Sequence, residues 1–207
     1  MSNPRVSVLI AACFATAAAV APAGAAHHGH KENQARGGDS AHRMLVEHAI
    51  VHLRPTRGQD VEGVVLFTQL PDGVRVDAEV HGLKPNSRHG FHIHEFGDIG
   101  APDGTATGGH YNPGGHAHAL PDNHSHDHDL KPDNVRHAGD LGNLEADAEG
   151  VARFSGTFDN FTIAGAMNPV LGRGMIVHAK ADDGGQPSGN AGDRIAQGVI
   201  GVDNPAK

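Results

Sequence analysis

The stretch Val74-Arg75-Val76-Asp77-Ala78-Glu79-Val80-His81 carries an apolar side chain at every second position. Because successive side chains of a strand point to opposite faces, this pattern predicts a half-buried antiparallel strand. Similar short runs surround it, separated by Gly, Pro, Asp and Asn: residues 47–53, 63–70, 90–96, 144–147, 151–158, 175–180 and 195–202. Eight short strands without a convincing helix predict an all-β sandwich or barrel.

The composition supports one turn-rich domain. The chain has 207 residues, of which 29 are glycine and 4% are aromatic, and it has no tryptophan. These values favour a β protein over a helical bundle. The net charge of -8 disfavours a general nucleic-acid binder, which needs a basic surface.

The N-terminus predicts an exported protein. Arg5 precedes an apolar run of about fifteen residues that ends in Ala23, Gly24 and Ala25, as in a secretory signal peptide. The run is shorter than the roughly twenty apolar residues of a membrane-spanning helix. We therefore expect residues 1–26 to be a signal peptide that directs the protein to a periplasm or to the medium.

Cys13 is the only cysteine, so the mature protein cannot form an internal disulfide. Residues 10–13 also resemble a lipoprotein cleavage site, but the apolar run continues past Cys13, which argues against lipidation.

Residues 27–45 are polar, carry four histidines and predict a disordered tail before a domain at 46–207. Residues 97–136 and 181–193 predict two long loops, and long loops in a compact domain usually carry function.

Histidine is over-represented, with 18 residues, and it is the side chain that most often binds metals. Of five His-x-His triplets, only His92/His94 lies in an apolar strand, where alternation places both rings on one face. The triplets His28/His30, His116/His118, His124/His126 and His126/His128 lie in polar contexts, typical of a metal-binding tract or a buffering tail.

Further metal-ligand candidates lie on other segments. His178 occupies a strand-like run, and His110 lies between glycines that allow close backbone approach. His137 and Asp140 stand three residues apart around Gly139. With a histidine from the preceding loop, they would form a mixed His/Asp set suited to zinc.

The motifs GFHIHEFGD, GGHYNP, HAGDLGN, VHAKADD and GNAGDRIAQGVIGV, in this order, resemble those of the copper/zinc superoxide dismutase family over about residues 49–202. The resemblance implies an eight-stranded Greek-key barrel that disproportionates superoxide to dioxygen and hydrogen peroxide and protects the cell envelope. It also implies copper ligands His92, His94, His110 and His178, and zinc ligands His110, His118, His137 and Asp140.

By the same resemblance, His110 bridges the two metals and takes part in proton transfer. Asp182 would join His92 to His118, and Arg194 would guide the anionic substrate. The choice of His118 rests on its offset from His110, since His116, His124, His126 and His128 are alternatives. The histidine-rich loop and tail leave open an exported copper or zinc buffer as the alternative function, and a purely structural β-sandwich is the remaining class.

The sequence departs from the family at its usual disulfide, where Ile99 and Gln197 occupy the matching positions. In the family the loop carrying that disulfide contributes to a dimer interface, so a homodimer and a monomer both remain open. A copper donor protein, if one is used, is not identified by the sequence.

We predict that dithiothreitol does not change the melting temperature of the mature protein at fixed metal content, because no disulfide is available to be reduced. A native disulfide typically stabilises by about 2–5 kcal/mol, so its reduction would be visible in calorimetry. A lower melting temperature with dithiothreitol alone would contradict the prediction.

Overall fold

Strand β3 (Gly73–His81) forms at the alternating stretch, and its burial follows the sequence pattern. Val74, Val76 and Val80 are fully buried. The alternate side chains face solvent, where Arg75 pairs with Asp77. Because one face is apolar and the other charged, a shift by one residue would expose the buried valines, and this fixes the register of β3.

The computed structural model describes residues 46–121 and 136–204. The predicted signal peptide, the tail and the loop histidines His124, His126 and His128 lie outside the described residues. The strands are β1 (His48–Pro55), β2 (Glu62–Leu70), β3, β4 (Arg88–His94), β5 (Asp140–Glu145), β6 (Ala152–Phe158), β7 (Gly174–His178), β8 (Arg194–Val199) and β9 (Gly201–Val202). A 3₁₀ turn, Thr105–Thr107, is the one helical element among the described residues.

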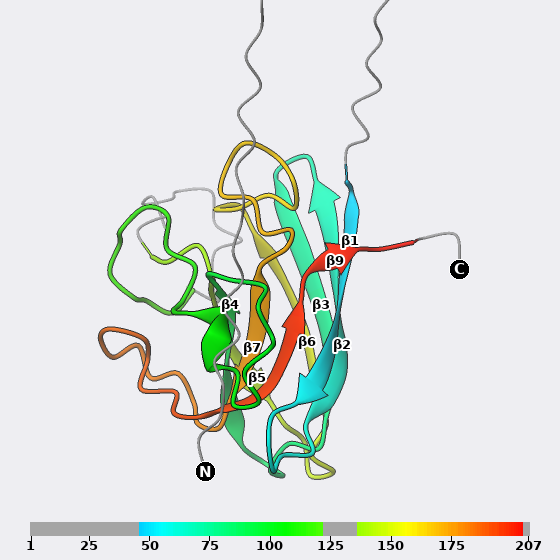
Figure 1. Ribbon diagram of the computed structural model, residues 1–207, viewed down its shortest axis with the longest axis vertical. Coiled ribbons are helices and arrows are strands. Elements are labelled where there is room, and N and C mark those ends of the chain that lie inside the picture. The colour runs from blue at the N-terminus through cyan, green and yellow to red at the C-terminus, as the bar shows by residue number, and fades with distance from the viewer. Residues whose placement is uncertain (1–45, 122–135, 205–207) are drawn as a thin grey trace, which may run out of the picture. The chain divides into compact units, whose positions relative to one another are not determined.

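The strands form an antiparallel barrel in the order β5-β4-β7-β8-β1-β2-β3-β6. An isolated bridge between Ala146 and Ala152 links the ends of β5 and β6 and nearly closes the barrel. β1, β2, β3 and β6 form one wall, and β4, β5, β7 and β8 form the other (Figure 1). The predicted all-β, eight-stranded barrel is confirmed; the short β9 pairs with β1 off the main path.

Two predicted strands, 144–147 and 195–202, differ clearly from the structure, and the other strand ends lie within two residues of the prediction. β5 begins at Asp140 instead of residue 144, because Asp140 pairs with His92 of β4 although Gly142 and Asn143 interrupt the apolar pattern. The last predicted strand is divided into β8 and β9 at Ile200, whose backbone N–H and C=O bond to Arg173 and Gly172. Tertiary backbone pairing therefore sets both ends.

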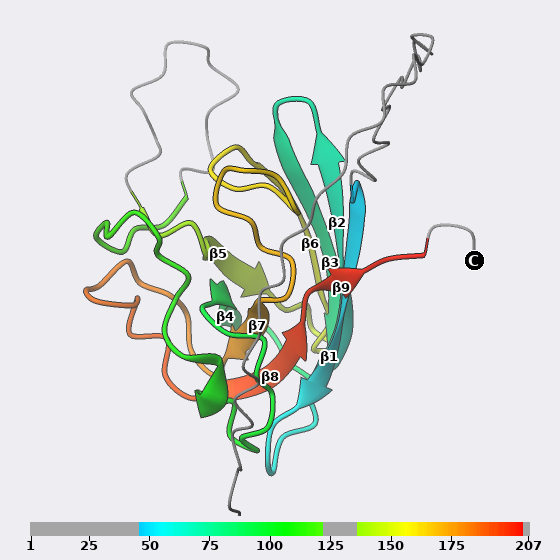
Figure 2. The same ribbon diagram turned by 45° about the horizontal axis from the view of Figure 1, so that its top comes forward.

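The two long loops extend from the β4/β7 wall. The segment that follows β4 and the segment between β7 and β8 lie on the same side of the barrel in both views (Figures 1 and 2). Within the described residues, no helix is long and apolar enough to cross a membrane. The fold thus brings both loops to one wall, where β4 contributes its paired histidines.

Candidate metal centre

Gly139 allows three histidine-bearing segments to meet. The Ile93 N–H donates to the Gly139 carbonyl, the Gly139 N–H to Tyr111, and the Tyr111 N–H to Ile93, each at 2.9 Å. A Cβ atom at position 139 would overlap the carbonyl oxygen of Ile93 and lie 3.0 Å from the Tyr111 nitrogen. The neighbours of these three residues include His92, His94, His110, Ala138 and Asp140, so the close approach places them around one point.

Seven buried side chains form two groups that share one histidine. Within each group the candidate ligand atoms all lie within 4.8 Å of one another. The first group is His92, His94, His110 and His178, and the second is His110, His118, His137 and Asp140. Segments that are up to 86 residues apart in the chain, from His92 to His178, are thus brought together.

Backbone carbonyls orient two rings of the first group. His94 Nδ1 lies 3.0 Å from the carbonyl oxygen of Gly108, and His178 Nδ1 lies 3.0 Å from that of Gly192. A carbonyl can only accept, so each Nδ1 carries the proton. The free lone pair is then on Nε2 in both rings, and the two Nε2 atoms lie 3.4 Å apart.

Asp182 connects the two groups. Its two carboxylate oxygens lie 2.8 Å from His92 Nε2 and 2.8 Å from His118 Nε2, and all three side chains are fully buried. Asn143 holds the Asp182 backbone on both sides: its amide donates to the Asp182 carbonyl at 2.9 Å, and its Oδ1 accepts from the Asp182 N–H at 2.7 Å. The Nδ1 atoms of His92 and His118 are therefore left facing their respective groups.

The second group converges on Asp140. One Asp140 oxygen lies 2.8 Å from His110 Nδ1 and 3.2 Å from His137 Nδ1, and the other lies 2.8 Å from His118 Nδ1. Despite these distances, Nδ1 of His118 and of His137 lacks hydrogen-bond geometry. His118 Nδ1 and His137 Nδ1 thus lie close to Asp140 without bonding to it, as expected for ligands of one cation.

Buried nitrogens without hydrogen-bond partners test whether metals fit. Nδ1 of His92, His118 and His137 is buried and has no hydrogen-bond partner among the described residues. Such atoms are costly unless an ion or water satisfies them. Three histidines and one carboxylate form a typical zinc donor set, and an all-imidazole set suits copper. The residues therefore fit a zinc ion in the second group and a copper ion in the first.

Three histidines of the first group, His92, His94 and His178, are held neutral. Burial lowers the pKa of His92 to about 4, although Asp182 opposes the shift, and burial lowers the pKa of His178 to about 3. Burial also brings the pKa of His94 well below its ordinary value. Metals bind neutral imidazole, so these rings are in the ligating form at neutral pH.

The carboxylates are held ionised. Burial opposes the charge of Asp140 and of Asp182, yet hydrogen bonds from their histidine partners outweigh it and hold each pKa well below the usual range. In the metal-free protein burial likewise opposes the charge of His118, but Asp140 and Asp182 raise its pKa to about 9. A cation in the second group would replace that proton.

The structure brings together every metal-ligand candidate that the resemblance implied. His116, the nearest alternative to His118, is exposed and belongs to neither group. The sequence analysis missed Asn143 and Gln186, whose amide holds the His118 backbone through two hydrogen bonds. Asn143 lies within the HAGDLGN motif and could have been suspected, whereas nothing in the sequence singled out Gln186.

Arg194 and Gln197 of β8 hold the loop that follows β4. The Arg194 guanidinium donates to the carbonyls of Gly104 and Gly108 and to the Thr107 hydroxyl. Gln197 is buried and donates to the Ala101 carbonyl at 3.1 Å. Amide and guanidinium hydrogen bonds therefore join this loop to the barrel, at the place where this sequence lacks the disulfide usual in the resembled family.

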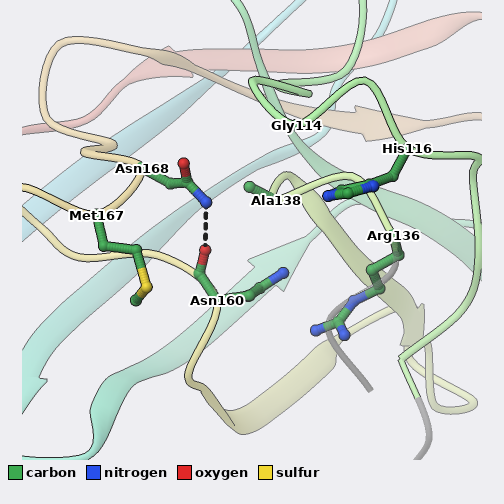
Figure 3. Close-up of a pocket in the computed structure, with 7 residues that line it drawn as sticks. All are labelled: Gly114, His116, Arg136, Ala138, Asn160, Met167 and Asn168. Atoms are coloured by element: carbon green, nitrogen blue, oxygen red, sulfur yellow. Dashed lines mark hydrogen bonds between the residues drawn. The ribbon is translucent and has the colours of Figure 1, made fainter. Parts of the chain in front are cut away.

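A separate cavity of about 110 Å³ lies beside the second group, lined by Gly114, His116, Arg136, Ala138, Asn160, Met167 and Asn168. Figure 3 shows the Asn160 amide pointing into it while Asn168 donates to the Asn160 carbonyl at 2.9 Å. Both polar atoms of the Asn160 amide are buried without a partner in the described structure. At roughly 30 Å³ per water, the cavity has room for a few ordered waters that would satisfy them.

A nearly closed antiparallel barrel with two adjoining ligand groups that share a histidine defines a dinuclear metalloprotein. The family model for copper/zinc superoxide dismutase (SODC) matches residues 61–200. The "Superoxide dismutase [Cu-Zn]" of Paramecium bursaria Chlorella virus 1 is 41% identical over 149 residues, which are 68% of this chain and 73% of the relative. The crystal structure of the clock protein EA4 matches with a TM-score of 0.64 and 33% identity, covering 86% of this chain and all of that one.

The chain therefore belongs to the copper/zinc superoxide dismutase family. It is a superoxide dismutase enzyme whose cofactors are copper and zinc. The match to the family model, residues 61–200, includes both ligand groups, whose members lie between His92 and His178.

We predict that Gly139→Ala weakens zinc binding and destabilises the protein by about 1–3 kcal/mol, the usual cost of forcing an atom into a packed site. The added methyl group must displace the Ile93 carbonyl, between His92 and His94. Zinc content after equilibration and urea unfolding of the metal-free protein measure the two effects. Gly201→Ala is the control, because its Cβ would meet no atom closer than 3.8 Å. Full zinc binding and unchanged stability in Gly139→Ala would contradict the prediction.

Proposed function

We propose that His92, His94, His110 and His178 hold the copper ion and that His110, His118, His137 and Asp140 hold the zinc ion. The observation that carries this proposal is the sharing of His110 by both groups. Its Nδ1 faces Asp140 at 2.8 Å, which leaves Nε2 for the copper side. Histidine alone among side chains offers two ring nitrogens, so it could serve as a ligand in both groups.

In this proposal copper supplies the one-electron redox chemistry when bound, and the protein supplies orientation and protons. Two superoxide anions and two protons give one dioxygen and one hydrogen peroxide. His110 takes up a proton at the nitrogen that faces the copper side and returns it to the reduced product. Asp182 keeps His92 and His118 in fixed tautomers while this occurs, since it accepts from Nε2 of both rings.

Arg194 binds the substrate anion beside the copper-side histidines. It is close enough that its charge contributes to the lowered pKa of His94 and of His178. Its donors are held by two carbonyls and a hydroxyl, and within residues 46–121 and 136–204 no carboxylate forms an ion pair with it. A planar guanidinium held in this way presents a fixed positive charge to a small oxyanion.

Residues 1–26 direct the enzyme across the inner membrane, so that it removes superoxide in the cell envelope or outside the cell. The support for this is the sequence of Arg5, the apolar run and the small residues before His27. An anion enters an apolar membrane only at high cost, so superoxide made outside that membrane must be removed there.

Arg194→Ala should lower kcat/KM for superoxide by about tenfold or more, since a hydrogen bond to a charged group contributes about 1.5–3 kcal/mol. The measurement is superoxide disappearance per bound copper in residues 27–207 loaded with both metals, beside the zinc-only form. Arg194→Lys keeps the charge, so its kcat/KM should lie between that of Arg194→Ala and that of the unaltered protein. Stoichiometric copper without turnover in the unaltered protein would instead favour the metal-buffer function.

Expression of residues 1–207 in a Gram-negative host should yield a periplasmic protein that begins near His27. Intact-mass spectrometry of the osmotic-shock fraction measures this, and a variant with Arg5 and the apolar run deleted is the control. Retention of Met1 in the cytoplasmic fraction would overturn the export proposal without affecting the enzyme assignment.

A further inference from the structure

The segment between β7 and β8 is acidic beyond Lys180, its one cation. Residues 181–193 include Asp182, Asp183 and Asp193 and no lysine or arginine. The whole chain has a net charge of -8, which repels an anion at long range. Lys180 does not line the cavity at Arg194, so a second cation inside that cavity comes from another segment.

A cavity of about 330 Å³ at Arg194 brings such a cation to the site. It is lined by Thr56, Arg57, Gln59, Asp103, Thr105, Gly192, Asp193 and Arg194. Gly192 is the residue whose carbonyl orients His178, so the cavity adjoins the copper-side group. Arg57 and Arg194 are the two cations in its lining.

The turn that carries Arg57 is fixed by its backbone. The Arg57 N–H donates to the Pro102 carbonyl at 2.6 Å, and the Thr56 hydroxyl donates to the Arg194 carbonyl at 2.7 Å. The Arg57 side chain forms no hydrogen bond or ion pair with any residue in 46–121 or 136–204. It is exposed, so its charge is available to the solvent in front of Arg194.

The charge balance of the cavity makes Arg57 decisive. Asp103 and Asp193 offset the two arginines, so the lining is close to neutral. Hydrogen bonds from the Thr105 hydroxyl and N–H lower the pKa of Asp103 and keep it ionised. Loss of Arg57 would leave one cation against two carboxylates, and an approaching anion would then be repelled.

We propose that Arg57 is a second anion-steering residue, which draws superoxide into the cavity at Arg194 without contacting the metals. This rests on the proposed role of Arg194 as the substrate-binding cation. Steering by a local field acts on the association rate and weakens with ionic strength, because the Debye length falls to about 8 Å at 0.15 M salt. Arg57, in the turn between β1 and β2, thus adds a second cation to Arg194, the arginine that the family resemblance implied.

The test compares Arg57→Gln with Arg153→Gln in the metal-loaded protein. Both variants remove one positive charge, but Arg153 lies on β6, in the wall opposite to β4 and β8, where it pairs with Glu79 and does not line the cavity. Arg57→Gln should lower kcat/KM roughly 2- to 10-fold at low salt, which is part of the 10- to 10³-fold range of electrostatic steering. It should also flatten the salt dependence, and the difference should vanish at high salt, while Arg153→Gln changes neither.

Asp103→Asn is the reciprocal variant and should raise kcat/KM at low salt. A second readout is azide binding, followed by the visible absorption of the copper-loaded protein, which should weaken in Arg57→Gln and not in Arg153→Gln. Equal rates and equal azide affinities in the two arginine variants would overturn the role of Arg57. Failure of the unaltered protein to turn over superoxide would overturn the proposed function instead, and azide binding would still report on Arg57.

Discussion

The centre depends on the carboxylate of Asp182. Removing an ionised carboxylate from water is expensive unless it is paired and hydrogen-bonded, and Asp182 is paired with His92 and His118 at 2.8 Å each. Because each ring is held through Nε2, its Nδ1 must point to its own ligand group. One buried side chain thus orients a residue in each group and sets the two groups at a fixed separation. The side-chain amide of Asn143, on β5, holds the backbone of Asp182, and Asp140 of the second ligand group begins the same strand.

The barrel provides the buried surface that this arrangement needs. Residues 89–94 of β4 are all buried, whereas β3 alternates between buried and exposed positions. Phe91 and Ile93 of β4 fill the core, and His92 and His94 face the other way, under the two long loops. The loops therefore replace water on the outer face of β4, and the lowered pKa of His92 is a consequence of that covering. A histidine pair on the open face of β3 would have remained solvated.

Local pattern predicted the strands better than it predicted the centre. The alternation of β3 and the placement of His92 and His94 on one face follow from the period of a strand, which needs no tertiary information. The start of β5 did not follow, because Asp140 joins the sheet through pairing with β4. The grouping of His110, His118 and His137 came from the family resemblance, since nothing in a sequence gives distances between loops. Gln186 and the carbonyl of Gly108 were missed for the same reason: each acts on a histidine that is at least 14 residues away.

The loop after β4 shows how the fold retains its geometry without cysteine. Arg194 and Gln197 are three residues apart on β8, and both donate to carbonyls of that loop. A hydrogen bond to a neutral group contributes about 0.5–1.5 kcal/mol, less than a disulfide, so several weaker contacts must act together. The same bonds that hold the loop also fix the guanidinium of Arg194, so loop order would be coupled to substrate binding in the proposed function. Because no thiol takes part, these hydrogen bonds do not depend on the redox state of the surroundings, and the proposed substrate site needs no oxidation step to form.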